Sequence, residues 1–309
     1  MIKYLHRPKS GTTTKTLEKY KKGAWVYVEN PDHHDITFLE QEFSVDPSLV
    51  EDATDEDEMP RLQREGDYTY VFTRYPYTND SLNIATAPVL FVVGKDVLIT
   101  ISTRPLARLD YFLEDKHDYN TEASTRLLLQ LLDQIDDEYE VKLNGISRQI
   151  KTIRSRLRIE DINNKDFIDF VLVEDVLNEF LSALVPTNSI LKRLLIGKHL
   201  TLHDEHEDIV EDLMLNNVQS IEACKSTLKT IVNIREAYST IMTNNLNRVI
   251  RLLTVLTVII SFPTLIASVY GMNVQLPFED SAFAFAGVMF VSLLVSILLL
   301  VIFKKRHWL

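Results

Sequence analysis

The sequence contains little cysteine and glycine, and parts of it lack charge altogether. Among its 309 residues there are one cysteine, Cys224, and eight glycines. A single cysteine excludes a disulfide within the chain and is typical of a reducing compartment. The glycines form no phosphate-binding loop or dinucleotide fingerprint, and a net charge of −11 argues against nucleic-acid binding. No pair of nucleophile and base stands out, so we expect neither an enzyme nor an organic cofactor.

Charge is missing from two stretches near the C-terminus, residues 252–278 and 281–303. As helices, residues 252–270 and 281–303 would be about 28 Å and about 35 Å long, and the hydrocarbon core of a bilayer is about 30 Å thick. Two uncharged runs of this length favour membrane spans over buried core helices of a soluble protein. We therefore predict a transmembrane hairpin within residues 251–303, with spans at about 251–271 and about 281–303.

The flanks of these runs predict their orientation. Two arginines precede the first run, and a basic tail at residues 304–309 follows the second. The loop between them, residues 272–280, carries only the acidic Glu279 and Asp280. By the positive-inside rule both termini lie in the cytoplasm and the loop lies outside. No apolar stretch at the N-terminus has the length of a signal peptide, so we expect a multi-pass protein of the plasma membrane.

The first 120 residues read as a mixed α/β domain. Runs rich in β-branched and aromatic residues are bounded by turn residues, which predicts strands. Helical stretches are expected at 35–43 and 46–62, where Asp46 would cap the helix and Pro47 would occupy its first position. The predicted strands are 24–30, 68–77, 84–93 and 97–103.

Residues 121–250 form the second predicted region, where strand signals stop and apolar residues recur at helical spacing. One helix is expected from about 163 to 197, bent or interrupted at Pro186. The next begins near His203 and meets no glycine before Gly271. A helix of this length, roughly 100 Å, would leave the cytoplasmic part as a stalk and continue into the membrane as the first span.

One face of this long helix is polar within the predicted membrane. A single Ser or Thr in a membrane helix usually bonds to its own backbone or packs against a neighbour. Several in register, at steps of three and four, instead predict a face turned toward water. Two helices cannot enclose a water-filled path, so this face, here called the pore stripe, predicts several copies of the chain around an axis. It consists of Asn247, Ile250, Leu253, Thr257, Ser261, Thr264 and Ser268.

The members of the pore stripe differ in what they offer an ion. Asn247 would form a lower polar ring, while Ile250 and Leu253 would form apolar constrictions that gate by excluding water. Above them, Asn273 stands at the join between the two apolar runs. Its amide oxygen can accept hydrogen bonds from the water shell of a strongly hydrated cation such as Mg²⁺ without stripping that shell.

Two further features belong to this outer end. Gly271 is expected to end the helix, because glycine accepts a positive φ without a Cβ penalty. Glu279 and Asp280 would either raise the local cation concentration or be ordinary solvated loop charges.

Four segments resemble one known family. YGMN at 270–273, followed by an acidic loop, a second apolar run and the tail KKRHWL, closely resembles the CorA family of magnesium transporters. NRVIRLLTVLTVIISFPTLIASVYGMN at 247–273 also resembles the pore helix of that family. DPSLVEDATDEDEMPRLQREGDYTYVF at 46–72 resembles its N-terminal segment, so the likeness covers nearly the whole chain.

The resemblance implies an architecture and a set of pore residues. The architecture is an α+β N-terminal cytoplasmic domain, long stalk helices and two C-terminal transmembrane helices, assembled as a funnel-shaped homopentamer. The Asn ring, apolar constriction and pore-facing Thr of the family map onto Asn247, Leu253 and Thr264. Ser261-Phe262 and Ser268 depart from its common pattern and leave the pore width open. The selectivity filter of the family maps onto Gly271, Met272 and Asn273.

The resemblance also implies a function. It is a divalent cation channel or transporter for potential-driven Mg²⁺ uptake, with Co²⁺ or Ni²⁺ as further cargo, gated by cytoplasmic Mg²⁺ at acidic sites between subunits. Candidate regulatory ligands are Asp212, Glu51 and Asp52, each of which could equally belong to a solvated acidic face. The alternatives are an exporter of the same fold for Zn²⁺ or Co²⁺, and a membrane-anchored sensor or scaffold that conducts nothing.

Overall fold

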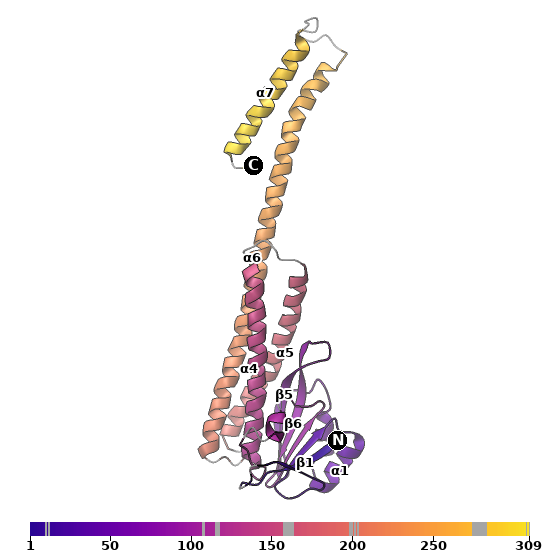
Figure 1. Ribbon diagram of the computed structural model, residues 1–309, viewed down its shortest axis with the longest axis vertical. Coiled ribbons are helices and arrows are strands. Elements are labelled where there is room, and N and C mark those ends of the chain that lie inside the picture. Colours follow the sequence, from indigo (N-terminus) through magenta and orange to yellow (C-terminus); the bar gives the residue numbers. More distant parts are fainter. Residues whose placement is uncertain are drawn as a thin grey trace. The chain divides into compact units, whose positions relative to one another are not determined.

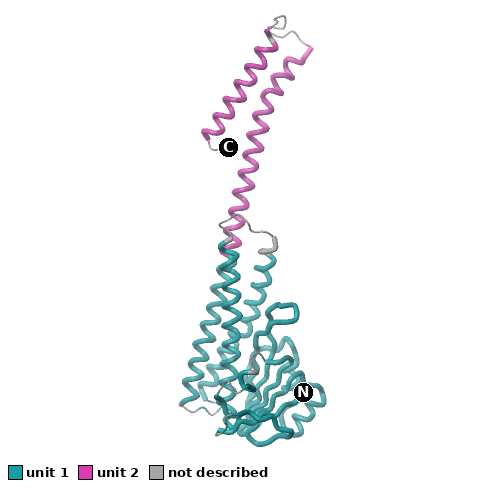
Figure 2. The backbone as a smooth tube through the Cα atoms, viewed as in Figure 1, with its two compact units in different colours: residues 1–232 teal, residues 233–309 magenta. Residues whose placement is uncertain are grey.

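The chain separates into two compact units, Met1–Val232 and Asn233–Leu309 (Figure 2). The computed structural model describes residues 1–309 apart from positions 10, 12, 107–108, 115–117, 157–163, 198–199, 201, 203, 274–282, 307 and 309. Helix α6, Asp204–Tyr270, contributes to both units as one continuous helix of 67 residues. This agrees with the predicted long helix that runs on into the first apolar span.

Unit 1 is built on a mixed sheet, of which seven strands lie in the described part of the chain. Their order is β2-β1-β3-β7-β6-β5-β4, and β3 pairs with β7 in parallel. The other described pairs are antiparallel, and the most extensive joins β5 to β6. The strands are β1 (Ile2–His6), β2 (Lys15–Leu17), β3 (Trp25–Glu29), β4 (Arg61–Glu65), β5 (Tyr68–Thr78), β6 (Ile84–Val93) and β7 (Leu98–Ser102).

The central strands are buried on both faces, which explains why they read as nearly continuous apolar runs. In β3, Trp25 and Tyr27 enter one core while Val26 and Val28 enter the other, as the alternation of a strand requires. The second core is covered by α1 (His33–Phe43) and α2 (Pro47–Asp52). The sheet therefore separates two apolar layers.

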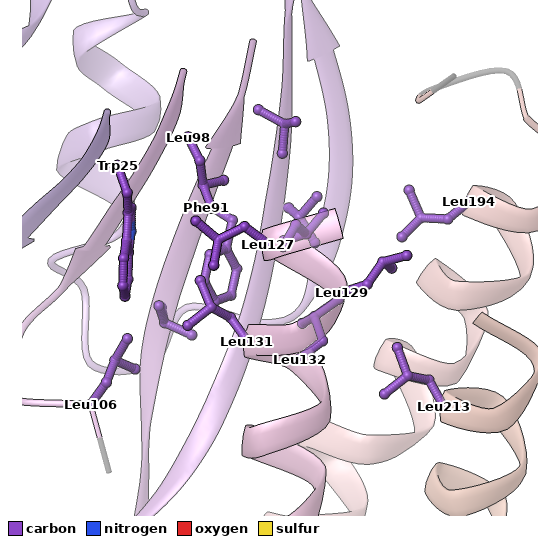
Figure 3. Close-up of a cluster of buried hydrophobic side chains, with 14 of the residues drawn as sticks. Trp25, Phe91, Leu98, Leu106, Leu127, Leu129, Leu131, Leu132, Leu194 and Leu213 are labelled. Carbon is purple, nitrogen blue, oxygen red and sulfur yellow. The ribbon is translucent and has the colours of Figure 1, made fainter. Parts of the chain in front are cut away.

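The first core lies between the sheet and the long helices. Figure 3 shows Leu127 and Leu131 of α4 (Ser124–Arg156) beside Trp25 and Phe91 of the sheet. Leu213 of α6 belongs to the same cluster. Within unit 1, α4, α5 (Asn164–Leu195) and the first part of α6 run alongside one another (Figure 1). The first part of α6 is thus held to the sheet by apolar packing.

Several local predictions are confirmed. The four predicted strands correspond to β3, β5, β6 and β7. At α2, the Asp46 side chain accepts a hydrogen bond of 2.9 Å from the Ser48 backbone, and Pro47 is the first helical residue. An interruption at Pro186, one of the two outcomes predicted there, is wrong, because helix α5 continues through this proline.

The prediction of a helix over 46–62 is wrong beyond Asp52. After α2 the chain turns, with the Asp57 backbone donating to the Asp55 side chain, and β4 begins at Arg61. Pro60 favours an extended backbone at the residue before it and helps to end helical structure. The predicted elements also omit the edge strand β2, its neighbour β1 and the short α3 (Leu109–Leu113).

Unit 2 contains the end of α6 and helix α7, Ala284–Lys305. Both helices are long and apolar enough to cross a membrane. Very few side chains in their apolar segments are buried. This exposure contradicts the alternative of core helices of a soluble protein, whose apolar side chains would be covered.

Candidate functional site

In unit 2, the covered residues of α6 and α7 lie along one face of each helix. Val255 is only 1% exposed and Ser292 of α7 only 7% exposed, whereas Leu253 is 60% exposed. Half-buried neighbours at helical spacing extend both faces. They are Val258, Ile259, Pro263 and Ile266 on α6, and Val288, Val295, Ser296, Leu299 and Phe303 on α7.

The pore stripe occupies the other side of α6. At about 100° per residue, the members from Ile250 to Ser268 lie roughly 120–180° around the helix from Val255 and Ile259, whereas Asn247 lies about 80° from Val255. All of the residues of the stripe are exposed in the single chain. A polar face that the hairpin itself leaves uncovered is available to line a path between several copies, as the sequence predicted, or to contact another subunit.

Three of the four hydroxyls of the stripe bond to their own helix, which is the ordinary behaviour of Ser and Thr in a membrane helix. Thr257 donates to the Leu253 carbonyl at 2.8 Å, and Ser261 donates to the Thr257 carbonyl at 2.7 Å. Thr264 donates in the same way at 2.9 Å. Because the proton of each hydroxyl points into the helix, its oxygen lone pairs remain as acceptors on the surface. The stripe therefore presents acceptors, which suit the protons of a hydrated cation.

Below the hydroxyls, the stripe becomes apolar and then ends in an amide. Ile250 and Leu253 are exposed, and so is Asn247 one helical turn further down. The Asn247 carbonyl accepts a hydrogen bond of 3.3 Å from Arg251. The order amide, apolar residues, hydroxyls is the order that the sequence predicts along this face.

The helix ends at Tyr270, immediately before Gly271, as predicted, but not for the predicted reason. Gly271 is not among the described glycines with positive φ. Its backbone donates to the Ala267 carbonyl at 3.0 Å, and a Cβ here would lie 3.3 Å from that carbonyl oxygen. Close approach to the last helical turn, and not a left-handed backbone, is what favours glycine. Met272 and Asn273 follow as exposed residues.

The predicted regulatory ligands lie apart in the sequence and differ in their surroundings. Asp212 on α6 and Glu51 on α2 are exposed. Asp52 is half-buried and forms an ion pair of 2.6 Å with Arg61, which also pairs with Glu58. Arg61 was not predicted as a partner of Asp52, because residues 46–62 read as one helix. Glu279 and Asp280 lie outside the described residues.

Comparison with known proteins gives a consistent result. Residues 20–305 match the family described as CorA-like Mg²⁺ transporter protein. The cobalt/magnesium transport protein CorA of Methanocaldococcus jannaschii is 21% identical over 293 residues, which cover 92% of this chain and 90% of that protein. The magnesium transport protein CorA of Campylobacter jejuni is 25% identical over 303 residues, covering 92% and 91%.

Two solved full-length structures share the fold. The complete CorA magnesium transporter from Methanocaldococcus jannaschii superposes with a TM-score of 0.89 at 17% identity, over 100% of this chain and 99% of that one. The full-length CmaX protein gives a TM-score of 0.76 at 16% identity and covers 97% of both chains. The α+β domain, the long helix and the two apolar helices are therefore one recurring architecture.

Proposed function

Because this chain belongs to the CorA-like Mg²⁺ transporter family, we propose that it conducts Mg²⁺ into the cell through a pore lined by the α6 stripes of five identical subunits. The chain is a divalent cation transporter of the membrane; the ion, the direction and the number of subunits are the proposal. The observation that carries it is the position of the pore stripe opposite the face of α6 that is covered in the hairpin.

The chemistry of the stripe suits a cation that keeps its water. Mg²⁺ dehydrates reluctantly and holds several waters, whose protons point outward. Thr257, Ser261 and Thr264 have their own protons engaged by the backbone, so their oxygens can accept hydrogen bonds from those waters. A ring of Asn273 amides would do the same at the mouth, without a fixed charge that would slow release.

The gate is assigned to the apolar part of the stripe. Rings of Ile250 and Leu253 would exclude water when they are close together and admit it when α6 moves. Asn247 below them would receive the ion on the cytoplasmic side. The basic Lys304 and Lys305 at the end of α7 favour cytoplasmic termini and a plasma-membrane location.

Uptake needs no chemical energy source. Two charges that cross about 100 mV gain about 4.6 kcal/mol, which sustains a gradient of roughly a thousandfold. Cytoplasmic Mg²⁺ bound by Asp212 of one subunit and Glu51 or Asp52 of the next would hold the ring closed, because the carboxylates repel one another once the ion leaves. Because Asp52 is already paired with Arg61, Glu51 is the more available ligand for the ion.

Cobalt is the second cargo to test, because the similar Methanocaldococcus jannaschii protein is named a cobalt/magnesium transporter. Competition between Co²⁺ and Mg²⁺ in liposomes measures the preference directly. Absence of Mg²⁺ influx under an inside-negative potential would exclude the proposed uptake and leave the exporter and the non-conducting sensor.

The filter role of Asn273 gives the first prediction. Asn273→Ala removes the amide acceptors at the mouth, so we expect Mg²⁺ influx into liposomes to fall at least about tenfold, the equivalent of about 1.4 kcal/mol. Asn178→Ala, which truncates an exposed amide on α5, is the matched control and should transport normally. Wild-type flux in the Asn273 variant would refute the filter.

A further inference from the structure

One of the proposed regulatory carboxylates already holds a cation that belongs to the chain itself. Arg61, the first residue of β4, forms an ion pair of 2.6 Å with Asp52, the last residue of α2. The other arm of the same guanidinium pairs with Glu58. A guanidinium is planar, forked and always charged, so it can hold two carboxylates at once. The negative charge of Asp52 is therefore compensated within one subunit before any metal ion binds.

The position of Arg61 is fixed by more than its ion pairs. Its guanidinium lies over the ring of Phe72, with 4.0 Å between the Cζ atom and the ring centroid. Arg61 and Phe72 stand opposite each other in the β4–β5 pair, and Phe72 is buried. A cation over an aromatic face is stabilised by the ring. The guanidinium thus has a place at the sheet that does not depend on Asp52.

The two carboxylates differ in how firmly they hold Arg61. The side chain of Glu58 is 13% exposed, and its backbone carbonyl accepts a hydrogen bond of 2.7 Å from the buried Arg74. A carboxylate that is nearly covered is costly without a cation. The side chain of Asp52 is 45% exposed, and an ion pair that is open to water contributes little to stability. Arg61 can therefore leave Asp52 and stay with Glu58 and Phe72.

We propose that Arg61 is an internal counter-cation that competes with the regulatory divalent cation for Asp52, and so sets the cytoplasmic Mg²⁺ concentration at which transport stops. Without the ion, Arg61 occupies Asp52. With Mg²⁺ bound, the carboxylate turns to the ion, and Glu58 and Phe72 retain the guanidinium. A neighbouring positive charge repels the ion, so Arg61 weakens Mg²⁺ binding at this position. Arg61 has this role only if Asp52 is a regulatory ligand, as the proposed function holds.

The test is the internal Mg²⁺ concentration that halves Mg²⁺ influx into liposomes containing the full-length protein. Arg61→Gln removes the competing charge, so Mg²⁺ should bind more tightly and this concentration should fall at least about threefold. Arg61→Lys keeps the charge and should stay within about twofold of the wild type. A purely structural role predicts the opposite sign, because a disturbed segment around Asp52 would bind Mg²⁺ more weakly. An unchanged or raised value for Arg61→Gln would overturn the proposal.

Arg104→Gln is the matched control. Arg104 is exposed and pairs at 3.2 Å with Glu56, which belongs to the same acidic segment but is not among the proposed ligands. Its removal should leave the half-inhibiting concentration as it is in the wild type. A fall equal to that of Arg61→Gln would show a general effect of charge on the segment, and competition for Asp52 would be excluded.

Two further measurements distinguish failure of the competition from failure of the proposed regulation. On an Asp52→Asn background, Arg61→Gln should shift the half-inhibiting concentration no further, because the contested carboxylate is gone. If Asp52→Asn alone is inhibited like the wild type, the regulatory role of Asp52 fails. If Asp52→Asn alters inhibition and Arg61→Gln does not, only the competition fails.

The second measurement needs no transport. Mg²⁺ that binds the folded protein raises its unfolding temperature in detergent, and the concentration giving half of this rise reports binding alone. Arg61→Gln should lower that concentration, and Asp52→Asn should abolish the difference between Arg61 and Gln at position 61. Equal Mg²⁺ dependence of the wild type and Arg61→Gln would overturn the competition even in a preparation that conducts nothing.

Discussion

At the scale of single residues, burial changes what a side chain can do. Cys224 is buried, and desolvation raises the pKa of its thiol to about 12, so it has almost no reactive thiolate at neutral pH. Asp136 is also buried, but its burial opposes the ionised form that a carboxylate normally adopts. The thiol of Cys224 is therefore unreactive, whereas the carboxyl group of Asp136 makes stability depend on pH.

This burial predicts a pH dependence of unfolding in EDTA. The pKa of Asp136 is about 7 in the folded chain and near its ordinary value of 3.8 once unfolded. Between these values the folded state binds more protons, so stability should fall as pH rises from about 4 to 7, by a few kcal/mol in order of magnitude, and stay low above 7. Asp136→Asn should remove this loss.

Thermal unfolding of the full-length protein in EDTA at pH 5 and pH 8 measures the effect. The variant should be the more stable protein at pH 8, and the difference should shrink at pH 5. A variant that is equally destabilised at both pH values would show that the carboxylate makes a favourable contact instead.

At the scale of elements, helix α6 has two faces that differ in burial and polarity. Val255, Ile259 and Ile266 lie on the face that is covered in unit 2, while Ser261, Thr264 and Ser268 lie on the uncovered polar face. Pro263 removes one backbone donor from the middle of the apolar span, yet the helix continues to Tyr270. The polar face and the missing backbone hydrogen bond at Pro263 distinguish this stretch as the part of the helix suited to line a pore.

Cysteine accessibility tests this division. With Cys224 replaced by serine, no thiol remains, so Thr264→Cys and Ile266→Cys can be compared as single labels. A small charged thiol reagent should modify Cys at 264 rapidly and reduce Mg²⁺ flux, because that face would line the water-filled path of the proposed assembly. It should modify Cys at 266 at least about tenfold more slowly, because thiolate is scarce at a desolvated site. Equal labelling would place both faces in the same environment.

At the scale of the whole molecule, the proposed pore requires several copies of the chain. A hairpin of α6 and α7 leaves apolar side chains such as Leu265 and Leu293 exposed beside a polar stripe. Lipid can cover the apolar side chains but not the polar stripe, because polar groups are costly to place in hydrocarbon. Assembly around an axis would place the polar stripe against water on the inside and the apolar side chains against lipid on the outside.

The expected number of copies is five. Native mass spectrometry of the full-length protein released from detergent should therefore give five times the mass of one chain. Leu253→Asp, which places a ring of charges at the proposed constriction, should keep this mass but alter conduction. A particle of one or two chains would contradict the pore, because so few stripes cannot enclose a water-filled path.

The sequence by itself determined the membrane hairpin, the long helix and the stripe. Their signals are local: an absence of charge over two spans, no glycine before Gly271 in the long helix, and hydroxyls at steps of three and four. The family signature at 270–273 allowed the filter to be predicted in the same way. These features are periodic or contiguous in the chain, so they could be read before any fold was known.

Only the tertiary structure decided which distant groups meet. Nothing local pairs Asp136 with Asn217, which are 81 positions apart and meet because α4 and α6 pack in one unit. The strand at Arg61, misread as helix, forms because β5 offers it a hydrogen-bonding edge. Burial and strand pairing are decided by contacts between segments, and such contacts leave no period in the sequence.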